Sequence, residues 1–491
     1  MTSHPHPSEL AELNRLFQAQ RAAFEQHAPL SCARRLEALD ALLQLVLSSQ
    51  DEIADAINAD FGQRATVETQ LLEIFPLADE IRHIKRHLAR WMRPRSVPVN
   101  WQFLPSRAYI HYQPKGVVGI VGTWNYPLLL ALSPLAEALA AGNHVLLKPS
   151  ENAPRCAAWL QQALASIFPP EYVAVFEGGR DLSAAFVSLP FDHLLFTGST
   201  QVGRLVVKAA AENLTPTTLE LGGKSPALVH EEFPVAEAAD RICSAKFWNA
   251  GQTCVAPDYA LVHERQVESF VQACEQSVLQ RFPQPTANPH YTHMSGPAGW
   301  KRMKELVEDA REKGAEIRPI GAAQASSSGS GPWPPTLILA ASDSMRVMQE
   351  EIFGPLLPVL GYSSIATALN WMRIRPRPLA LYYFDRDSER VRVVLEQTWS
   401  GGVTVNDCIF HLPQHGLPFG GIGHSGMGSY HGFDGFTTFS KKKGVFRQSR
   451  LSGIVMDRLF KPPYPRAGKA TLEFLIGKAR KKPVRRFRLD A

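Results

Sequence analysis

The stretch that decides the fold runs from Val117 to Leu147 and reads VVGIVGTWNYPLLLALSPLAEALAAGNHVLL. Its two ends, residues 117–121 and 144–147, are short apolar runs of the kind that form buried strands, and residues 128–141 between them predict a helix. A strand, a helix and a second strand in this order predict a parallel sheet that is covered by helices. In such sheets, ligands bind beyond the carboxyl ends of the strands.

The same alternation continues after Leu147. The sequence predicts further strands at 173–176 and 193–197, and helices at 153–168, 182–188 and 201–212. A second unit of the same kind follows, with predicted strands at 227–230, 259–263, 379–384 and 402–405 and predicted helices at 235–248 and 266–282. Residues 321–335 are rich in Ala, Ser, Gly and Pro, which predicts a mobile surface loop. A chain of 491 residues has room for two or three such units.

The residues before this pattern predict helices. Ser8 can cap the first helix, a second spans 34–47, and a third spans 67–91 with Pro76 bending or interrupting it. The Pro-rich segment 93–105 predicts a connector, and 107–113 alternates as an exposed strand does.

Composition excludes several classes of protein. Hydrophobic residues make up 45% and charged residues 20%, and the net charge of +6 arises largely from a basic cluster after residue 477. The rest of the chain is therefore close to neutral, without the basic, aromatic-rich face of a nucleic-acid groove.

Six cysteines occur without a Cys-x-x-Cys pair, so neither a metal site nor a redox dithiol is expected. Free thiols fit a reducing compartment, and the N-terminus lacks a signal-peptide pattern. No apolar run reaches the roughly 18 residues that a membrane span needs. We expect a cytoplasmic protein without a transmembrane anchor.

Short motifs follow one another along the chain in a definite order. They are Thr123-Trp-Asn-Tyr-Pro127, Leu147-Lys-Pro-Ser-Glu151, Leu219-Glu-Leu-Gly-Gly223, Phe247-Trp-Asn-Ala-Gly-Gln-Thr-Cys-Val-Ala-Pro257 and Gln349-Glu-Glu-Ile-Phe-Gly-Pro355, followed by Pro418-Phe-Gly-Gly421. Each alone has an ordinary structural explanation, such as a turn, a packing contact or an ion pair. Together, from about Gly116 to Phe439, they resemble the aldehyde dehydrogenase superfamily.

This resemblance implies an α/β fold of two doubly wound parallel-sheet domains with a small antiparallel oligomerisation flap. The implied segments are 1–106 (N-terminal helices of the cofactor domain), 107–116 (flap), 117–221 (dinucleotide-binding domain), 222–405 (catalytic domain), 406–445 (return to cofactor domain and flap) and 446–491 (basic C-terminal tail). Within the last two segments, Phe433–Lys441 is the expected second contributor to the flap.

The resemblance also implies a reaction. An aldehyde releases hydride only after it has become tetrahedral, which requires a nucleophile of low pKa, an oxyanion site, a nicotinamide cofactor and a base. Cys254 is the implied nucleophile, and Asn125 the implied oxyanion donor. Glu220 is the implied base, because its apolar flanks favour a raised pKa.

The implied cofactor is NAD, with NADP as the alternative. Lys148 and Glu151 would hold the adenosine ribose, Glu351 the nicotinamide ribose, and Phe353 would pack near the nicotinamide. The remaining implied cofactor residues are Trp124, Ser150, Gly198, Ser199, Gly203 and Leu221. The turn from Gly198 to Gly203 is not a Gly-x-Gly-x-x-Gly fingerprint, so without the resemblance it is equally well explained by packing.

The segment 417–432 resembles the shorter class of the family, which includes fatty, aromatic and coniferyl aldehyde dehydrogenases and is usually dimeric. Tyr126, Trp248, Phe410 and His411 are the expected substrate-pocket residues, which favours an apolar or aromatic aldehyde. Three alternatives stay open: a coenzyme A-acylating dehydrogenase, a thiol hydrolase or esterase, and a structural protein on an enzyme fold.

Overall fold

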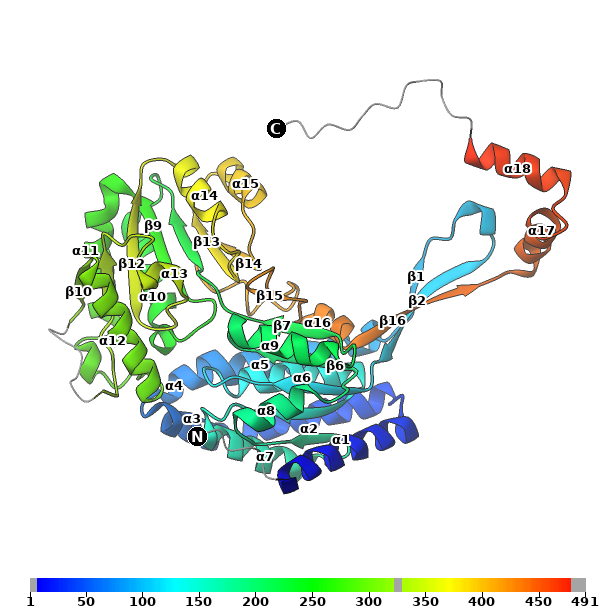
Figure 1. Ribbon diagram of the computed structural model, residues 1–491, viewed down its shortest axis with the longest axis horizontal. Helices are drawn as coiled ribbons and strands as arrows, with labels where there is room; N and C mark the ends of the chain where they lie inside the picture. Colours follow the sequence, from blue (N-terminus) through cyan, green and yellow to red (C-terminus); the bar gives the residue numbers. More distant parts are fainter. Residues whose placement is uncertain (1–6, 322–328, 478–491) are drawn as a thin grey trace. The chain divides into compact units, whose positions relative to one another are not determined.

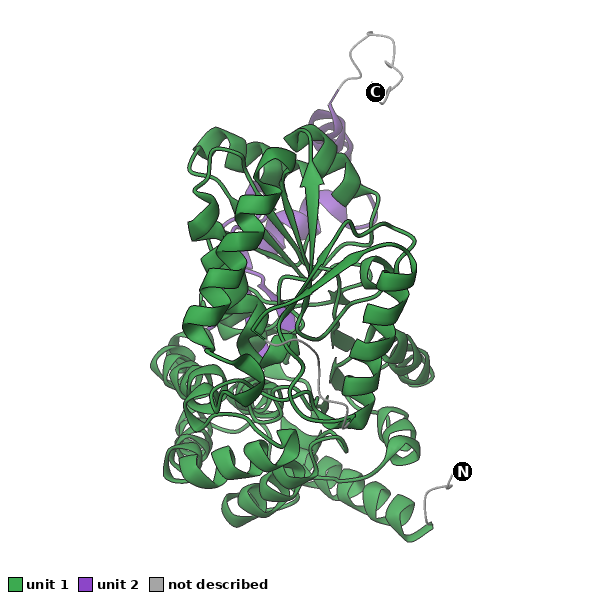
Figure 2. Cartoon of the chain, turned by 90° about the vertical axis from the view of Figure 1, so that its left-hand side faces the viewer, with its two compact units in different colours: residues 1–91, 113–441 green, residues 92–112, 442–491 purple. Residues whose placement is uncertain are grey.

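The computed structural model describes residues 7–321 and 329–477. It contains two compact units, which Figure 2 shows in different colours. The first unit comprises residues 1–91 and 113–441 and holds two large sheets, and the second comprises residues 92–112 and 442–491.

The first sheet belongs to the predicted cofactor domain. In the described part of the chain its strands follow the order β15 (Gly426–Met427), β7 (Thr217–Glu220), β6 (His193–Thr197), β3 (Val117–Val121), β4 (His144–Lys148) and β5 (Val173–Val175). All pairs are parallel except β15 with β7. The register places Val121 opposite Lys148 and Thr197 opposite Glu220, so the carboxyl ends of these strands share one edge.

Helices pack on this sheet, as Figure 1 shows, which confirms the predicted α/β class. They are α1 (Pro7–His27), α2 (Cys32–Ser48), α3 (Gln50–Phe61), α4 (Thr66–Thr69), α5 (Phe75–Trp91), α6 (Leu129–Ala141), α7 (Pro154–Ile167), α8 (Arg180–Val187), α9 (Thr200–Ala211) and α16 (Gly432–Thr438). The predicted apolar stripe of α1 is buried, since Leu13 and Phe17 are 1% and 0% exposed in a core that includes Val117 and Leu194.

The second sheet belongs to the predicted catalytic domain. Its order, for the residues described, is β10 (Glu316–Pro319), β11 (Thr336–Leu339), β12 (Leu356–Tyr362), β9 (Tyr259–His263), β8 (Pro226–Val229), β13 (Ala380–Phe384) and β14 (Gly402–Val405). Only β10 with β11 is antiparallel. Its helices are α10 (Val235–Phe247), α11 (Val267–Arg281), α12 (Gly296–Glu312), α13 (Arg346–Gln349), α14 (Ile365–Arg373) and α15 (Ser388–Gln397). Residues 322–328 of the loop expected to be mobile, 321–335, lie outside the described residues.

The second unit contains a small sheet in the order β1 (Arg95–Val97), β2 (Arg107–Pro114) and β16 (Ser440–Arg447), with β1 antiparallel to β2. The strand predicted at 107–113 is therefore present. The prediction for Phe433–Lys441 was wrong, because glycines and aromatic residues there form α16 and the strand begins only at Ser440.

Two helices, α17 (Arg450–Phe460) and α18 (Arg466–Ile476), occupy much of the segment that was expected to be a tail, 446–491. Ser449 caps α17 by accepting the N–H of Ser452 at 3.1 Å. The basic cluster after residue 477 lies outside the described residues. Within the ranges that are described, no helix has both the length and the apolar character needed to cross a bilayer.

The N-terminal helices differ from the prediction in two places. The segment Gln50–Phe61 forms α3, a helix that was not predicted from the sequence. The interruption expected at Pro76 is a π-helical segment just before it, η1 (Gln70–Ile74). Pro76 is then the second residue of α5, which continues η1 without a break, so the π-helical turn lies where the missing N–H of Pro76 interrupts the α-helical hydrogen bonds.

A buried ion pair joins these helices to the sheet. Arg64 donates to Glu73 at 2.7 Å, and both side chains are fully buried. The other oxygen of Glu73 accepts the N–H groups of Leu128 and Leu129 at 2.8 and 3.1 Å, at the start of α6. Arg64 also donates to the carbonyl of Asn125 at 3.4 Å. The pair therefore fixes the loop between β3 and α6.

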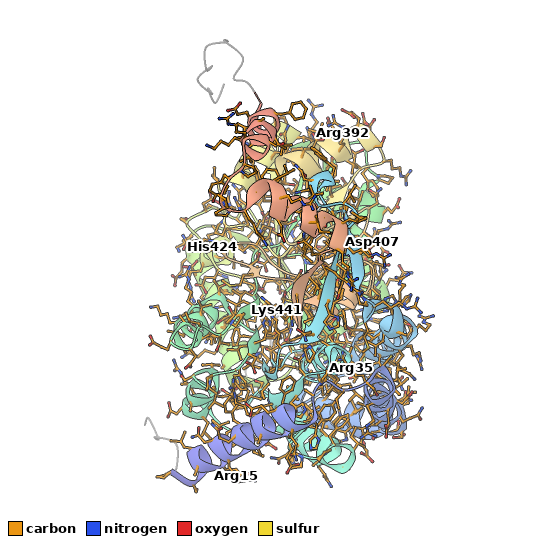
Figure 3. The ribbon with its side chains drawn as sticks, turned by 90° about the vertical axis from the view of Figure 1, so that its right-hand side faces the viewer. Arg15, Arg35, Arg392, Asp407, His424 and Lys441 are labelled. Carbon is orange, nitrogen blue, oxygen red and sulfur yellow. The ribbon has the colours of Figure 1, made fainter. Side chains whose placement is uncertain are left out.

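We expect Arg64→Met to destabilise the protein, because it leaves the Glu73 carboxyl buried without its cation. Breaking a buried pair from one side costs about 3–5 kcal/mol of unfolding free energy. Arg15→Met is the matched control: Arg15, on α1 in Figure 3, pairs with Glu12 at 2.7 Å but is 63% exposed, so its loss should leave the unfolding midpoint close to that of the wild-type protein. Urea unfolding followed by circular dichroism measures both, and equal midpoints for the two variants would contradict the prediction.

Candidate active site

Cys254 follows a loop with a left-handed backbone. Asn249, Ala250 and Gly251 in η3 (Trp248–Gly251) have φ angles of 51°, 49° and 74°. This conformation costs roughly 1–2 kcal/mol for each residue that carries a Cβ. Gly251 admits no side chain, since a Cβ would lie 2.4 Å from the carbonyl oxygen of Gly354. Strain of this kind persists only where surrounding contacts hold it, and it clusters at functional sites.

A network of amide side chains holds this loop. The N–H of Asn249 donates to Glu68 at 2.7 Å, and the Gln252 side chain donates to the carbonyls of Asn249 and His293 at 2.9 and 3.1 Å. Asn125, only 2% exposed, donates its amide to the carbonyl of Gln252 at 3.0 Å. An amide nitrogen carries two hydrogens, so Asn125 keeps one donor for another acceptor.

The thiol of Cys254 is held in its neutral form. Burial, followed by the neighbouring carboxyls of Glu351 and Glu220, raises its pKa to about 12. The backbone N–H groups of Cys254 and Val255 oppose this effect, but they do not outweigh it. The expectation of a low thiol pKa was therefore wrong for the protein by itself, because two acidic groups, and no cation among the described residues, shift the pKa of the sulfur.

Both carboxyls are themselves buried. Glu220 ends β7 at 3% exposure, and among the described residues neither of its side-chain oxygens has a hydrogen-bond partner. Burial raises its pKa well above the ordinary value, as its apolar flanks predict. Burial, followed by the charge of Asp258, raises the pKa of Glu351 to about 8. Gly222 makes room for Glu351, because a Cβ there would lie 1.9 Å from its Oε2.

Lys148 and its neighbours lie at the carboxyl end of β4. The buried ammonium of Lys148 donates to the carbonyl of Pro149 at 3.2 Å and to Glu151 at 3.3 Å. Burial lowers the pKa of Lys148, and Glu151 partly opposes this. Ser150 accepts the N–H of Asn152 at 3.3 Å. Glu151 itself is exposed, so its carboxylate is accessible at the edge of the sheet.

The turn after β6 lies at the same edge. Gly198 donates its N–H to the carbonyl of Glu220 at 3.0 Å, and Ser199 caps α9. Gly203 packs on Leu221, since a Cβ would lie 2.8 Å from that side chain. Packing therefore explains both glycines, and this is the alternative to cofactor contact that the sequence left open for the turn.

Trp124 and Phe353 also come together. Their ring centroids are 5.5 Å apart, edge to face, and Phe353 has a φ of 53°. Phe353 follows Glu351 by two residues, so the motif 349–355 brings an acid and an aromatic ring to the region of Cys254.

A cavity opens beside Cys254 and encloses about 810 Å³ of empty space, its open mouth included. Its lining is Leu72, Pro76, Glu80, Tyr126, Leu129, Leu130, Ser133, Trp248, Thr253, Cys254, Val255, Ile409, Leu412, Pro413, His415, Phe419, Tyr430 and His431. Most of these side chains are apolar.

The expected pocket residues divide into two groups. Tyr126 and Trp248 line the cavity, and the hydroxyl of Tyr126 lies 2.6 Å from that of Thr253. Phe410 and His411 do not line it: Phe410 is 48% exposed, and His411 stacks behind Phe419 with centroids 6.2 Å apart.

Several residues of the site were not identified from the sequence. Asn249 and Gln252 lie in the Cys254 motif, so their amide side chains, close in sequence to a reactive thiol, could have been predicted to belong to the site. Arg64 and Glu80 carry no such signal, because they lie in helical segments remote in sequence and reach the site only through the tertiary fold.

Comparison with known proteins bears on this geometry. A family model described as "Aldehyde dehydrogenase family" matches residues 3–445. A "Probable coniferyl aldehyde dehydrogenase" of Pseudomonas aeruginosa is 48% identical over 456 residues, covering 93% of this chain and 94% of the relative. A "Coniferyl aldehyde dehydrogenase" of Pseudomonas sp. (strain HR199 / DSM 7063) is 39% identical over 474 residues, covering 96% and 97%.

Two solved structures are also similar. The substrate-bound state of Staphylococcus aureus AldH has a TM-score of 0.88 at 35% identity, covering 94% of this chain and 99% of that one. A Mycobacterium tuberculosis aldehyde dehydrogenase complexed with NAD+ has a TM-score of 0.80 at 26% identity, covering 89% and 90%.

The pKa shifts predict how Cys254 responds to alkylation. With the thiol pKa raised, the rate of modification by iodoacetamide should still be rising with pH at pH 9. Glu351 has a pKa of about 8, so at pH 9 Glu351→Gln removes a negative charge next to the sulfur; the thiol pKa should fall and modification should become several-fold faster. Burial favours the neutral form of the Glu220 carboxyl, so Glu220→Gln should accelerate modification less.

The readout is mass spectrometry of the peptide containing Cys254, with Cys32 as the internal reference because it is part-exposed and remote in sequence. If neither glutamine variant changed the Cys254 rate relative to the Cys32 rate, the electrostatic account of the thiol would be wrong.

Proposed function

The chain belongs to the aldehyde dehydrogenase family, and we propose that it oxidises an apolar or aromatic aldehyde of the coniferyl type to the carboxylic acid, using NAD or NADP. The observation that carries the proposal is the position of Cys254 in the wall of a largely apolar cavity, with two buried glutamates acting on its sulfur. The names of two similar proteins support the choice of substrate.

The first step is attack by the Cys254 sulfur on the aldehyde carbon. The free N–H of Asn125 and the backbone N–H of Cys254 would stabilise the negative oxygen of the tetrahedral thiohemiacetal that results. The sulfur must lose its proton before or during attack, and Glu220 and Glu351 are the adjacent groups that can accept it. A neutral resting thiol limits side reactions until this proton moves.

The second half of the reaction releases the acid. Bound NAD or NADP would accept the hydride, leaving a thioester on Cys254. Glu220 would take a proton from the water that cleaves this thioester, and its raised pKa suits a base near neutral pH. Because a water base is present, we favour hydrolysis over transfer of the acyl group to coenzyme A.

The residues at the sheet edge fit a dinucleotide. Thr197 Oγ1 and Glu351 Oε1 are buried without a partner among the described residues, and such atoms match the hydroxyl groups of a ribose. Lys148 and Glu151 would hold the adenosine ribose, with Gly198, Ser199, Gly203 and Leu221 nearby. Trp124, Ser150 and Phe353 complete the proposed set. Exposed Glu151 favours NAD by repelling a 2′-phosphate, unless its side chain turns away.

Catalytic variants test the proposal. Cys254→Ala should abolish aldehyde-dependent reduction of NAD or NADP, and Asn125→Ala should lower kcat by about 100- to 1000-fold, the usual cost of one oxyanion donor. Cys243→Ala is the matched control, because Cys243 is buried in α10 and bonds only weakly to the Cys274 carbonyl. Undiminished oxidation by Cys254→Ala would refute the mechanism. Turnover that required coenzyme A, or ester cleavage alone without nicotinamide reduction, would favour the other two enzyme classes.

We further propose that the protein is a cytoplasmic homodimer. All six cysteines are free, which fits a reducing compartment. The second unit exposes large apolar side chains, including Trp101, Leu104, Phe446, Leu451 and Phe474. Such a concentration of exposed apolar surface is typical of an interaction site.

Light scattering should therefore give twice the mass of one chain. Leu451→Glu should shift this mass towards the monomer, because a charge would enter the interface. The control, Ile374→Glu, alters a side chain that is 80% exposed on the first unit and should leave the mass unchanged. A wild-type protein of single-chain mass would contradict the proposal.

A further inference from the structure

The cavity beside Cys254 has a polar group of side chains that the proposed reaction does not use. Glu80 and Ser133 both line it, at 4% and 1% exposure. Glu80 Oε1 and Ser133 Oγ have no hydrogen-bond partner among the described residues. A serine inside a helix usually bonds to the carbonyl four residues earlier, and Ser133 does not. Two unpartnered polar atoms in an apolar wall point to a polar group on the ligand.

The start of α6 connects Ser133 to the segment beside the sulfur. Tyr126 contacts Thr253, next to Cys254, and its carbonyl accepts the N–H of Leu130 in the turn that starts α6. Ser133 lies on α6 four residues after Leu129, the first residue of that helix, which is about 6 Å along the helix axis at 1.5 Å per residue.

The facing helical segment has the same arrangement. Leu72, Pro76 and Glu80 are four residues apart on η1 and α5 and all line the cavity, so apolar positions precede the acid. Because α5 packs on α6, the two helices bring Glu80 and Ser133 to the lining of one cavity.

A second buried acid lies behind Glu80. Glu137 is one turn beyond Ser133, and its pKa is raised well above the ordinary value, first by burial and then by the carboxyl of Glu80. Gly435 packs so closely that a Cβ would lie 2.0 Å from the Glu137 carboxyl carbon. Burial thus favours the neutral form of the Glu137 carboxyl, and the unpartnered Oε1 of Glu80 can accept a hydrogen bond from the cavity.

We propose that Glu80 and Ser133 bind the ring hydroxyl of a 4-hydroxycinnamaldehyde whose aldehyde carbon is at Cys254. The phenol donates to Glu80, and the Ser133 hydroxyl donates to the phenol oxygen. This para oxygen lies roughly 8 Å from the aldehyde carbon by standard bond lengths, whereas in a 4-hydroxybenzaldehyde it lies only about 6 Å away. The unpartnered oxygens of the cavity therefore select for the hydroxyl of the molecule. The assignment rests on the proposed function and adds the residues that choose its substrate.

The test compares kcat/KM for 4-hydroxycinnamaldehyde and for cinnamaldehyde, which lacks the hydroxyl. We expect the wild-type enzyme to prefer the hydroxylated compound by on the order of tenfold or more. Ser133→Ala and Glu80→Leu should each remove most of this preference and leave kcat/KM for cinnamaldehyde within about twofold. Leu130→Ala is the matched control, because it enlarges the cavity without removing a polar atom and should affect both substrates in the same proportion.

The outcomes distinguish a failure of the proposed function from a failure of the assignment of Glu80 and Ser133. If the wild-type enzyme oxidises neither compound nor any simpler aldehyde, the proposed function fails. If it oxidises both compounds equally, or if Ser133→Ala and Glu80→Leu lower both in the same proportion as Leu130→Ala does, the assignment fails and the two residues serve a structural or water-binding role. Should Glu80→Leu not fold, Ser133→Ala decides alone, because it removes a single oxygen.

Discussion

The left-handed backbone of residues 249–251 is the constraint on which the position of the reactive sulfur depends. Local preference opposes it, since two of the three residues carry a Cβ. Contacts from distant segments hold it: Glu68 binds one end, and the Gln252 amide spans the turn. Asn125 donates to the same segment, so the loop that carries the sulfur also positions the proposed oxyanion donor. Favourable contacts from distant segments thus compensate for the strain of this loop. The loop in turn fixes the two reacting groups relative to each other.

The electrostatics of the site favour a protein that is unreactive at rest. A buried thiol beside two buried acids keeps its proton, because every deprotonation would place a second negative charge in a poorly solvated region. The same electrostatic interaction makes the two carboxylates good proton acceptors once the negative charge has moved from the sulfur to the substrate oxygen. Thiol, Glu220 and Glu351 therefore act as one titrating group rather than three independent residues.

The sequence predicted those features that depend on local pattern. Short apolar runs marked β3, β6 and most of β4, and the order of short motifs indicated the family. What it could not predict depends on tertiary contact. Residues 433–438 contain glycine and aromatic residues that suit a strand or a helix, and packing on α5 and α6 selects the helix. Arg64 looks like any surface arginine until its burial against Glu73 is seen. The pKa of Cys254 likewise depends on which charges surround it, and no local motif encodes that.

Substrate selection follows from the same elements that position the chemistry. The loop carrying Asn125 continues directly into α6, the helix that carries Ser133. The Arg64–Glu73 pair fixes the start of that helix, and Glu73 lies in the π-helical segment that leads into α5 and Glu80. A change that loosened this pair would therefore affect both the nucleophilic end and the polar end of the cavity. Catalysis and recognition of the substrate hydroxyl are in this way coupled through one buried interaction.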